Sequence, residues 1–283
     1  MRILVYSSNP YTKEMLTQAN ADNEHEFEFS DARLDSKTAA LSKEYAGVCC
    51  FVDDTLNKKV LEKLHQQGVQ LILLRCTGFN HVDLQEVERL GLTVMRVADY
   101  SPHSVAEFAV GIILNLNRKI HRAYNRVHEG NFLLDGLLGF DLYGKTVGVV
   151  GTGKIGTVFA TIMRGFGCQV LACDINPNSD CEAMGVVYTD LDSLLSQSDI
   201  VSLHLPLTPD SFHLINKQRL AQMKKNALLI NTSRGAIIDA HDLIVALKKR
   251  QLAGVGLDVY EEESHLFYQD LRDQIIDDDT FSR

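Results

Sequence analysis

A glycine-rich loop directly after an apolar run is the feature that most constrains the fold of this chain. Gly151, Gly153 and Gly156 form a GxGxxG pattern that follows the run TVGVV and opens a helical pattern over residues 157–165. The first glycine permits a tight turn, the second lets the backbone approach a pyrophosphate, and the third lets the helix pack on the strand. The pyrophosphate would lie at a helix N-terminus, where free N–H groups favour anions. This context predicts a dinucleotide-binding βαβ unit.

An acidic residue at the end of the next apolar run strengthens this interpretation. Asp174 follows the glycines by about 20 residues, where a carboxylate can accept protons from both ribose hydroxyls of NAD and repel the 2′-phosphate of NADP. Ile175 and Asn176 come next, so no arginine stands there to hold a phosphate. Asp174 could instead be a turn residue at a strand end, but its position and spacing favour NAD binding.

Short apolar runs alternate with helical patterns along the whole chain, which predicts βα units on parallel sheets. A length of 283 residues favours two domains. Ser101 and Pro102 are typical of a helix start and begin a long apolar helical pattern at a compact hinge near residue 100. The expected fold is α/β with two doubly wound parallel-sheet domains, residues 1–100 and 101–283. The expected strands lie at 2–6, 47–52, 69–75, 92–97, 145–151, 168–174, 199–206, 227–235 and 252–260, and the expected helices at 12–19, 58–66, 84–90 and 241–249.

Charge and composition exclude some functions. With 37 acidic and 28 basic residues the net charge is -9, which disfavours binding to nucleic acid or to an anionic membrane surface. No apolar segment approaches the roughly 18 residues of a membrane span, so we expect a cytoplasmic protein. The six cysteines show no CxxC spacing, and we expect them to be reduced, with no metal site and no disulfide.

Two charged residues follow late apolar runs. Arg234 lies in the segment TSRG after ALLIN, where open α/β sheets bind ligands, and an arginine there can grip a carboxylate with two hydrogen bonds. Glu263 ends the run Glu261-Glu262-Glu263. Taken alone, Arg234 is more often a surface residue, and Glu263 is more often one of three solvated charges.

Together the motifs GTGKIG, HLPLT, NTSRG and GLDVYEEE, in this order and spacing, resemble the D-isomer-specific 2-hydroxyacid dehydrogenase family. The segments RCTGFNHVD, RVADYSPHSVAEFAVG and LNRKIHRAYNRVHEGNF are similar to its D-lactate dehydrogenase branch. The resemblance spans nearly the whole chain. It implies a Rossmann NAD-binding domain joined to a flavodoxin-like substrate domain, and reversible hydride transfer between NADH and pyruvate that gives D-lactate.

Carried over onto matching positions, the resemblance implies the roles of several residues. Arg234 orients the substrate, and Glu263 pairs with a catalytic histidine. Backbone N–H groups around Thr77 and Gly78 hold the substrate carboxylate, and Tyr100 lines the substrate pocket. Asp258 contacts the nicotinamide, while His204 and Pro206 lie beside the adenosine. The full set expected at the cofactor is Gly151, Gly153, Lys154, Ile155, Gly156, Asp174, His204, Pro206, Thr232 and Asp258.

One element of the family pattern is not matched. The family's proton-donating histidine lies some thirty residues beyond the glutamate in a GHxAF-like motif, and this sequence ends at Arg283 before it. None of the ten histidines occupies the matching position. His265 is two residues from Glu263, and on an extended segment it would point to the other side. The sequence is therefore either part of a longer parent protein or a short product with impaired activity.

Three functions remain open. The leading hypothesis is a D-lactate dehydrogenase, and the second is the same chemistry on a larger 2-oxo acid, since pocket size depends on side chains such as Phe51, Val52 and Tyr100. The third is a catalytically inactive NAD-binding module. Retention of both Arg234 and Glu263 argues against it. The apolar helix at 105–116 and the family resemblance suggest a homo-oligomer, a dimer or tetramer, although that helix could equally be buried between domains.

Overall fold

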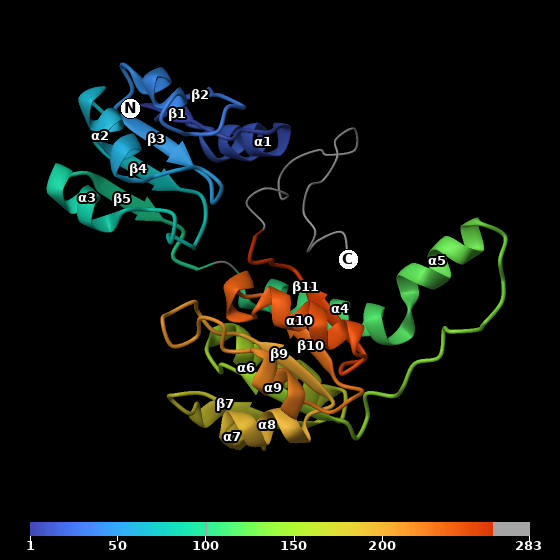
Figure 1. The fold of residues 1–283 in the computed structure, drawn as a ribbon. Coiled ribbons are helices and arrows are strands. Elements are labelled where there is room, and N and C mark those ends of the chain that lie inside the picture. The colour runs from blue at the N-terminus through green and yellow to red at the C-terminus, as the bar shows by residue number, and fades with distance from the viewer. Residues whose placement is uncertain (100, 263–283) are drawn as a thin grey trace. The chain divides into compact units, whose positions relative to one another are not determined.

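The computed structural model describes residues 1–99 and 101–262 (Figure 1). Contacts between residues divide the chain into two compact units, Met1–Tyr100 and Ser101–Arg283. Each unit is built on a parallel sheet, and each is described by itself. The fold-class prediction is confirmed.

The first unit is a five-stranded parallel sheet in the order β2-β1-β3-β4-β5, the flavodoxin-like order. Its inner strands β1, β3 and β4 are short and apolar because both of their faces are covered. One face packs on α2 and α3, and the other lies against α1. Its elements in chain order are β1 (Arg2–Val5), α1 (Pro10–Ala19), β2 (Glu26–Phe29), the 3₁₀ helix η1 (Thr38–Ser42), β3 (Gly47–Cys50), α2 (Lys58–Gln66), β4 (Leu71–Leu74), α3 (Leu84–Leu90) and β5 (Thr93–Arg96).

The second unit is a six-stranded parallel sheet in the order β11-β10-β9-β6-β7-β8. Counted from its first strand this is the 3-2-1-4-5-6 order of dinucleotide-binding folds, read from the opposite edge. Its elements are α4 (Pro102–Arg118), α5 (Ile120–His128), β6 (Thr146–Val150), α6 (Lys154–Gly165), β7 (Gln169–Cys173), α7 (Ser179–Ala183), β8 (Val187–Tyr188), α8 (Leu191–Gln197), β9 (Ile200–Leu203), α9 (Lys217–Gln222), β10 (Leu228–Asn231), η2 (Gly235–Ile237), α10 (Ala240–Lys248) and β11 (Gly254–Leu257).

Alternating side chains of this second sheet fill two cores. Val147 and Val149 join Phe159 and Met163 on the face covered by α4 and α6. Val150 and Leu229 belong to the opposite core, which α8, α9 and α10 cover. Because burying an apolar side chain of this size contributes about 1.5–3 kcal/mol, these two cores fix the strand register and therefore the positions of the loops that follow each strand.

Polar caps decide where most helices begin. The Asn9 side chain accepts a hydrogen bond from the N–H of Thr12, so α1 begins at Pro10, two residues before the expected start. Ser101 caps α4 through the N–H of Ser104, as the Ser-Pro pattern indicates. The buried apolar residues of α4 pack against α6, β10 and β11 within the second unit, whereas Phe108 is 50% exposed.

Sequence patterns missed some short elements. Strand β2 carries the sequence EFEF, whose glutamates are exposed and whose phenylalanines are half-buried, because it lies at the sheet edge. Helix α5 was not expected either, and none of its residues is buried. Within the described part of the chain, no helix is long and apolar enough to cross a membrane.

Candidate active site

The glycine-rich loop lies at the point where the strand order of the second sheet reverses. The chain leaves β6 toward β7 on one side, while β9 pairs with β6 on the other. In open α/β sheets, ligands bind outside the carboxyl ends of the strands at this switch point. The two loops that begin there meet closely, since the N–H of His204 donates to the carbonyl oxygen of Val150 at 2.7 Å.

The loop backbone is enclosed at two glycines and open at the third. A Cβ on Gly151 would lie 2.3 Å from the carbonyl oxygen of His204, and one on Gly156 would lie 1.9 Å from the carbonyl oxygen of Gly151. Around Gly153 no atom of the described residues lies within 4 Å of that position. Gly153 also precedes α6, whose first N–H groups receive no side-chain cap from the described residues. These features fit the pyrophosphate of a dinucleotide.

Asp174 holds the loop that it faces. Its carboxylate accepts hydrogen bonds from the N–H of Thr152 at 2.5 Å and the Thr152 hydroxyl at 3.2 Å, and from the N–H of Asn176 at 2.9 Å. The side chain is only half-buried, so its oxygens remain open to a further donor. Asp174 therefore combines a structural contact with the position expected of a ribose ligand.

His204 lies against the glycine loop as a neutral ring. Its Nε2 lies 2.9 Å from the hydroxyl of Ser202, and its ring packs on Phe159 with centroids 4.8 Å apart. Burial lowers the pKa of His204 to about 4, so the imidazole is uncharged near neutral pH. Its buried Nδ1 has no hydrogen-bond partner among the described residues. Pro206, two residues on, is exposed.

The loop that carries Arg234 is fixed by the buried Asn231 at the end of β10. The Asn231 side chain donates to the carbonyl oxygen of Arg234 at 2.9 Å and accepts from the N–H of Ser233 at 3.0 Å. The Ser233 hydroxyl donates to the carbonyl oxygen of Leu203 at 2.7 Å. Among the described residues, the Arg234 guanidinium bonds only the carbonyl oxygen of Ser233 and forms no ion pair. A partly exposed arginine whose charge is not paired with a described carboxylate can bind an anionic ligand.

Asp258 begins the next loop along the same edge of the sheet. Its N–H donates to the carbonyl oxygen of Asn231 at 3.0 Å, which places it beside the Arg234 loop. Desolvation raises the pKa of its carboxyl above the ordinary value. Thr232, which begins the Arg234 loop, is buried.

In the first unit, Thr77 and Gly78 follow β4 at the carboxyl edge of the sheet. The preceding Arg75 donates to the carbonyl oxygens of Tyr6 at 2.6 Å and Ser7 at 2.7 Å, which ties this loop to the end of β1. The Cys76 thiol lies 3.2 Å from the carbonyl oxygen of Gly78. The sequence analysis did not single out Arg75. The only sequence feature that could have indicated its role is its position at the end of an apolar run.

Buried polar atoms without partners gather where ligands are expected. Leaving such an atom unpaired costs about 1–3 kcal/mol, so each needs an explanation. Within the described ranges eight side-chain atoms are of this kind, and seven follow the carboxyl end of a strand, the exception being Gln222. The seven belong to Ser8, Asp53, Arg75, Thr77, His81, His204 and Thr232. Bound ligand or water at these edges would satisfy them.

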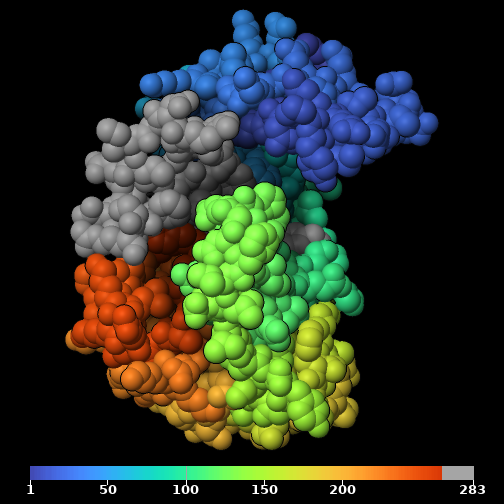
Figure 2. Space-filling view, turned by 90° about the vertical axis from the view of Figure 1, so that its right-hand side faces the viewer, coloured from blue at the N-terminus to red at the C-terminus, as the bar shows by residue number. Residues whose placement is uncertain are grey.

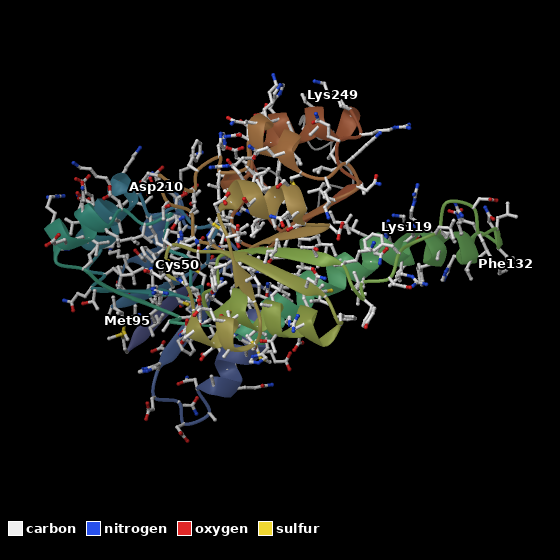
Figure 3. All side chains as sticks on the ribbon, turned by 90° about the horizontal axis from the view of Figure 1, so that it is seen from below. Cys50, Met95, Lys119, Phe132, Asp210 and Lys249 are labelled. Atoms are coloured by element: carbon white, nitrogen blue, oxygen red, sulfur yellow. The ribbon has the colours of Figure 1, made fainter. Side chains whose placement is uncertain are left out.

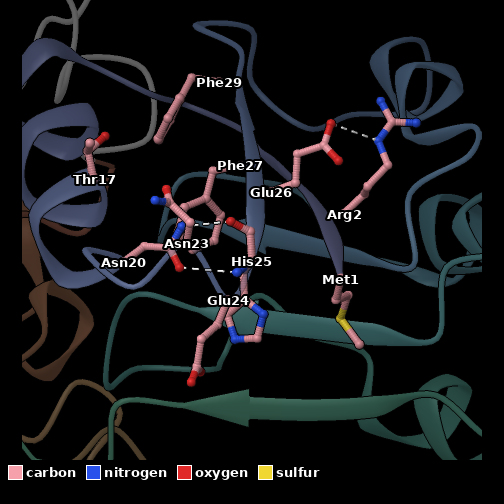
Figure 4. Close-up of a pocket in the computed structure, with 10 residues that line it drawn as sticks. All are labelled: Met1, Arg2, Thr17, Asn20, Asn23, Glu24, His25, Glu26, Phe27 and Phe29. Carbon is pink, nitrogen blue, oxygen red and sulfur yellow. Dashed lines mark hydrogen bonds and ion pairs between the residues drawn. The ribbon is translucent and has the colours of Figure 1, made fainter.

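A separate hollow lies at the opposite end of the first sheet (Figure 4). It is lined by Met1 and Arg2, by the segment that joins α1 to β2, and by β2 itself. An ion pair of 3.2 Å links Arg2 to Glu26 there, and both side chains are well exposed. Because parallel sheets bind ligands at their carboxyl ends, this hollow is not a candidate active site.

Comparison with known proteins agrees with this geometry. Residues 110–278 match the family model of the D-isomer specific 2-hydroxyacid dehydrogenase, NAD binding domain. The D-lactate dehydrogenase of Escherichia coli is 48% identical over 283 residues, which cover 100% of this chain and 86% of that protein. The chain belongs to the D-isomer-specific 2-hydroxyacid dehydrogenase family. This membership confirms the resemblance stated from the sequence motifs.

Other relatives share the fold as well as the sequence. A D-lactate dehydrogenase of Curvularia clavata is 50% identical over 287 residues, covering 100% of this chain and 82% of that protein. The structure of the pyruvate reductase of Chlamydomonas reinhardtii superposes with a TM-score of 0.94 at 44% identity, and the match covers 100% of this chain and 85% of that one. The apo-structure of D-lactate dehydrogenase from Escherichia coli superposes with a TM-score of 0.89 at 48% identity, and the match covers 93% of this chain and 83% of that one.

As a member of this family, the D-2-hydroxyacid dehydrogenase described here is an oxidoreductase. The family model is that of an NAD-binding domain, which confirms the expectation of NAD as cofactor. The enclosed Gly151, the open Gly153 and the half-buried Asp174 fit that cofactor. Tyr100 and Glu263, which the sequence analysis assigned to the substrate pocket and the catalytic pair, lie outside the described residues.

The dehydrogenase also contains a polar network that sequence reasoning missed. The Tyr188 hydroxyl donates to the Thr152 hydroxyl at 2.8 Å and accepts from the N–H of Asn178 at 2.8 Å. The Asn178 side chain donates to the Thr157 hydroxyl at 3.1 Å. The network ties the loop after β6 to the loop after β7, where Asp174 lies. Its members carry no motif, because their meeting depends on how the loops after β6 and β7, helix α6 and the end of β8 are placed.

Proposed function

We propose that this protein is an NAD-dependent D-lactate dehydrogenase, which interconverts pyruvate and D-lactate. The observation that carries the proposal is the Arg234 loop, where Asn231 and Ser233 fix the backbone while the guanidinium makes no ion pair with the described carboxylates. The names of relatives at 48% and 50% identity support the substrate. A small 2-oxo acid carries the carboxylate and the carbonyl that such an arginine binds.

For the cofactor, we assign the pyrophosphate to the N–H groups of residues 151–156, including Lys154 and Ile155, and the ribose hydroxyls to Asp174. His204, Pro206 and Thr232 would border the adenosine and nicotinamide halves, and Asp258 the carboxamide. NADH, when bound, supplies the hydride that reduces the substrate carbonyl carbon. The carboxylate of Asp174 favours NAD over NADP because a second negative charge at the 2′ position would be repelled.

For the substrate, we assign Arg234 to the carboxylate and to the carbonyl oxygen on which negative charge develops. A positively charged donor aimed at that oxygen stabilises the transition state. The backbone N–H groups of Thr77 and Gly78 are proposed to hold the carboxylate, with Tyr100 bordering the methyl group. Glu263 is proposed to pair with the histidine that supplies the proton, raising the pKa of that histidine.

The proposal is tested with protein produced from its native gene. NADH oxidation is followed with pyruvate and with bulkier 2-oxo acids, and the product is identified with stereospecific lactate oxidases. We expect kcat/KM to be highest for pyruvate and the product to be D-lactate. A higher kcat/KM for a bulkier acid would assign the enzyme to that substrate instead. NADH binding without turnover of any 2-oxo acid would identify an NAD-binding module.

We also propose that this dehydrogenase associates with a second copy of itself through residues 120–138, the projecting arm. Ile120, Tyr124 and Val127 share one exposed side of α5, and the segment that follows exposes Phe132, Leu133, Leu134 and Leu138. Leu134 is 80% exposed and Leu138 is 91% exposed.

The arm begins where α4 ends, at Lys119, and carries Phe132 at its far end (Figure 3). Figure 2 shows the arm in light green. Large exposed apolar side chains gathered on one projecting segment indicate an interaction site, and a symmetric dimer would cover two such arms.

A further inference from the structure

His213 lies between two carboxylates in the second unit. Its Nε2 lies 2.7 Å from Oε1 of Glu261, and its Nδ1 lies 3.3 Å from Oδ2 of Asp239. The three side chains are 25% to 30% exposed, so each interaction is partly shielded from water. Both ring nitrogens thus face an acceptor, and the imidazole joins two segments that are far apart in the sequence.

The backbone around His213 holds the ring in this place. Its φ of 48° lies in the left-handed region, which a residue with a side chain rarely adopts unless surrounding contacts require it. The N–H of His213 donates to the carbonyl oxygen of Ala236 at 2.9 Å. The ring also stacks on Phe212, with centroids 4.0 Å apart. A side chain positioned by so many contacts is suited to fix what it binds.

Both segments that His213 holds lead to residues of the proposed site. Ala236 and Asp239 follow Arg234 within five residues, and Glu261 precedes Glu263 by two. The segments touch directly as well, because a Cβ on Gly235 would lie 2.2 Å from the carbonyl carbon of Tyr260. The loop after β10 and the segment after β11 therefore pack backbone against backbone, with His213 bonded to both.

We propose that His213 is a positioning residue. By bridging Asp239 and Glu261, it holds the Arg234 loop against the segment that leads to Glu263. The inference rests on the proposed function, since it assumes that Arg234 binds the substrate and that Glu263 pairs with the histidine that supplies the proton. The arginine and the proton donor that serve one small substrate must keep their spacing within a fraction of an ångström, because a displacement of about 1 Å can cost about a hundredfold in rate.

The test separates the two bonds of the ring in protein produced from its native gene. His213→Leu removes both bonds. His213→Gln can place a donor near the position of Nε2 and keep the bond to Glu261, whereas His213→Asn can reach only Asp239. Phe212→Leu is the matched control, since it removes the stacked ring and leaves both bonds. For each variant, kcat and KM for pyruvate are measured with the Kd for NADH.

We expect His213→Leu and His213→Asn to lower kcat/KM for pyruvate roughly ten- to a hundredfold, with the Kd for NADH changed less than about twofold. His213→Gln should recover most of the rate, because it keeps the bond to Glu261 while the N–H of residue 213 still bonds Ala236 beside the Arg234 loop. Phe212→Leu should resemble the wild type. The double variant His213→Leu/Glu261→Leu should be no worse than His213→Leu alone, because His213→Leu already removes the bond to Glu261.

An unchanged kcat/KM in His213→Leu would overturn the inference. It would also be overturned if the fold-loss of kcat/KM in the double variant equalled the product of the fold-losses in the two single variants. Equal weakening of NADH binding in all His213 variants would also overturn it, because that result indicates general loss of structure. The variant Arg234→Gln distinguishes failure of the positioning role from failure of the proposed function. If Arg234→Gln is inactive while His213→Leu is fully active, only the positioning role is wrong, and if Arg234→Gln keeps full activity, the proposed function is wrong.

Discussion

The carbonyl oxygen of His204 lies 2.3 Å from the position that a Cβ would take on Gly151. The loop after β9 and the loop after β6 therefore approach as closely as a glycine allows. This contact sets the shape of the cofactor site, because it directs the chain from Gly151 toward the start of α6.

Gly151→Ala is expected to disrupt this contact. The residue has a φ of 94°, which alanine adopts only with strain, and the added methyl group meets backbone that cannot move aside. We expect the free energy of unfolding to fall by at least about 2 kcal/mol and NADH binding to be lost. Urea denaturation and fluorescence titration with NADH measure both effects.

Gly153→Ala is the matched control for that change. Its Cβ position is clear of the described residues, so the variant should fold normally. If the pyrophosphate approaches there, the Kd for NADH should rise about tenfold or more while stability stays the same. Unchanged NADH affinity in Gly153→Ala would place the pyrophosphate elsewhere.

Asp174→Asn should weaken NADH binding without unfolding the loop. The amide keeps one oxygen that accepts from the N–H of Thr152, but it loses the charge that separates NAD from NADP. We expect the KM for NADH to rise roughly tenfold and the preference for NADH over NADPH to fall. Steady-state kinetics with both cofactors measures the ratio, and Asp192→Asn, on α8, is a control on an exposed carboxylate of the same unit. An unchanged preference for NADH over NADPH would show that Asp174 only stabilises the loop after β6.

Arg234→Lys and Arg234→Gln should lower kcat/KM for pyruvate at least about a hundredfold, because neither side chain offers the two parallel donors of a guanidinium. The fold should be unaffected, since the hydrogen bonds that hold the loop come from Asn231 and Ser233. Circular dichroism and the Kd for NADH serve as controls. A lysine variant with the wild-type rate would contradict a two-pronged contact.

His204 should make the stability of the protein depend on pH. The folded pKa of about 4 lies below the ordinary value of 6.5, so between these two pH values the unfolded chain binds a proton that the folded chain does not. Stability is therefore complete above pH 6.5 and falls as the pH drops toward 4, by about 1–3 kcal/mol. Urea denaturation of wild type and His204→Gln at pH 7.5 and 5.0 measures this. Equal pH dependence in both proteins would contradict the assignment.

Charges placed in the projecting arm should separate the proposed dimer. Leu134 and Leu138 become buried if two copies pair through this surface, so Leu134→Asp/Leu138→Asp should give a monomer. Val187→Asp is the control, because Val187 is exposed in the short strand β8, apart from the arm. Sedimentation velocity measures the mass. The same mass for all three proteins would exclude the arm as the interface.

Sequence alone determined the class of fold and the cofactor. Strand and helix patterns are local, so the helices at 58–66 and 84–90 are found where periodicity placed them. Gly151, Gly153 and Asp174 are recognised at fixed spacing because one βαβ unit builds the whole motif. The edge strand β2 was missed, since half-exposed residues carry a weak apolar signal.

Only the tertiary structure decided which side chains support the site. Tyr188 reaches Thr152 across 36 positions, and His213 reaches Glu261 across 48. No local pattern encodes such pairs, because they form only after parallel strands are set in register and bring the ends of separate loops to one edge. For the same reason the sequence named Arg234 but could not show that Asn231 and Ser233 hold its loop.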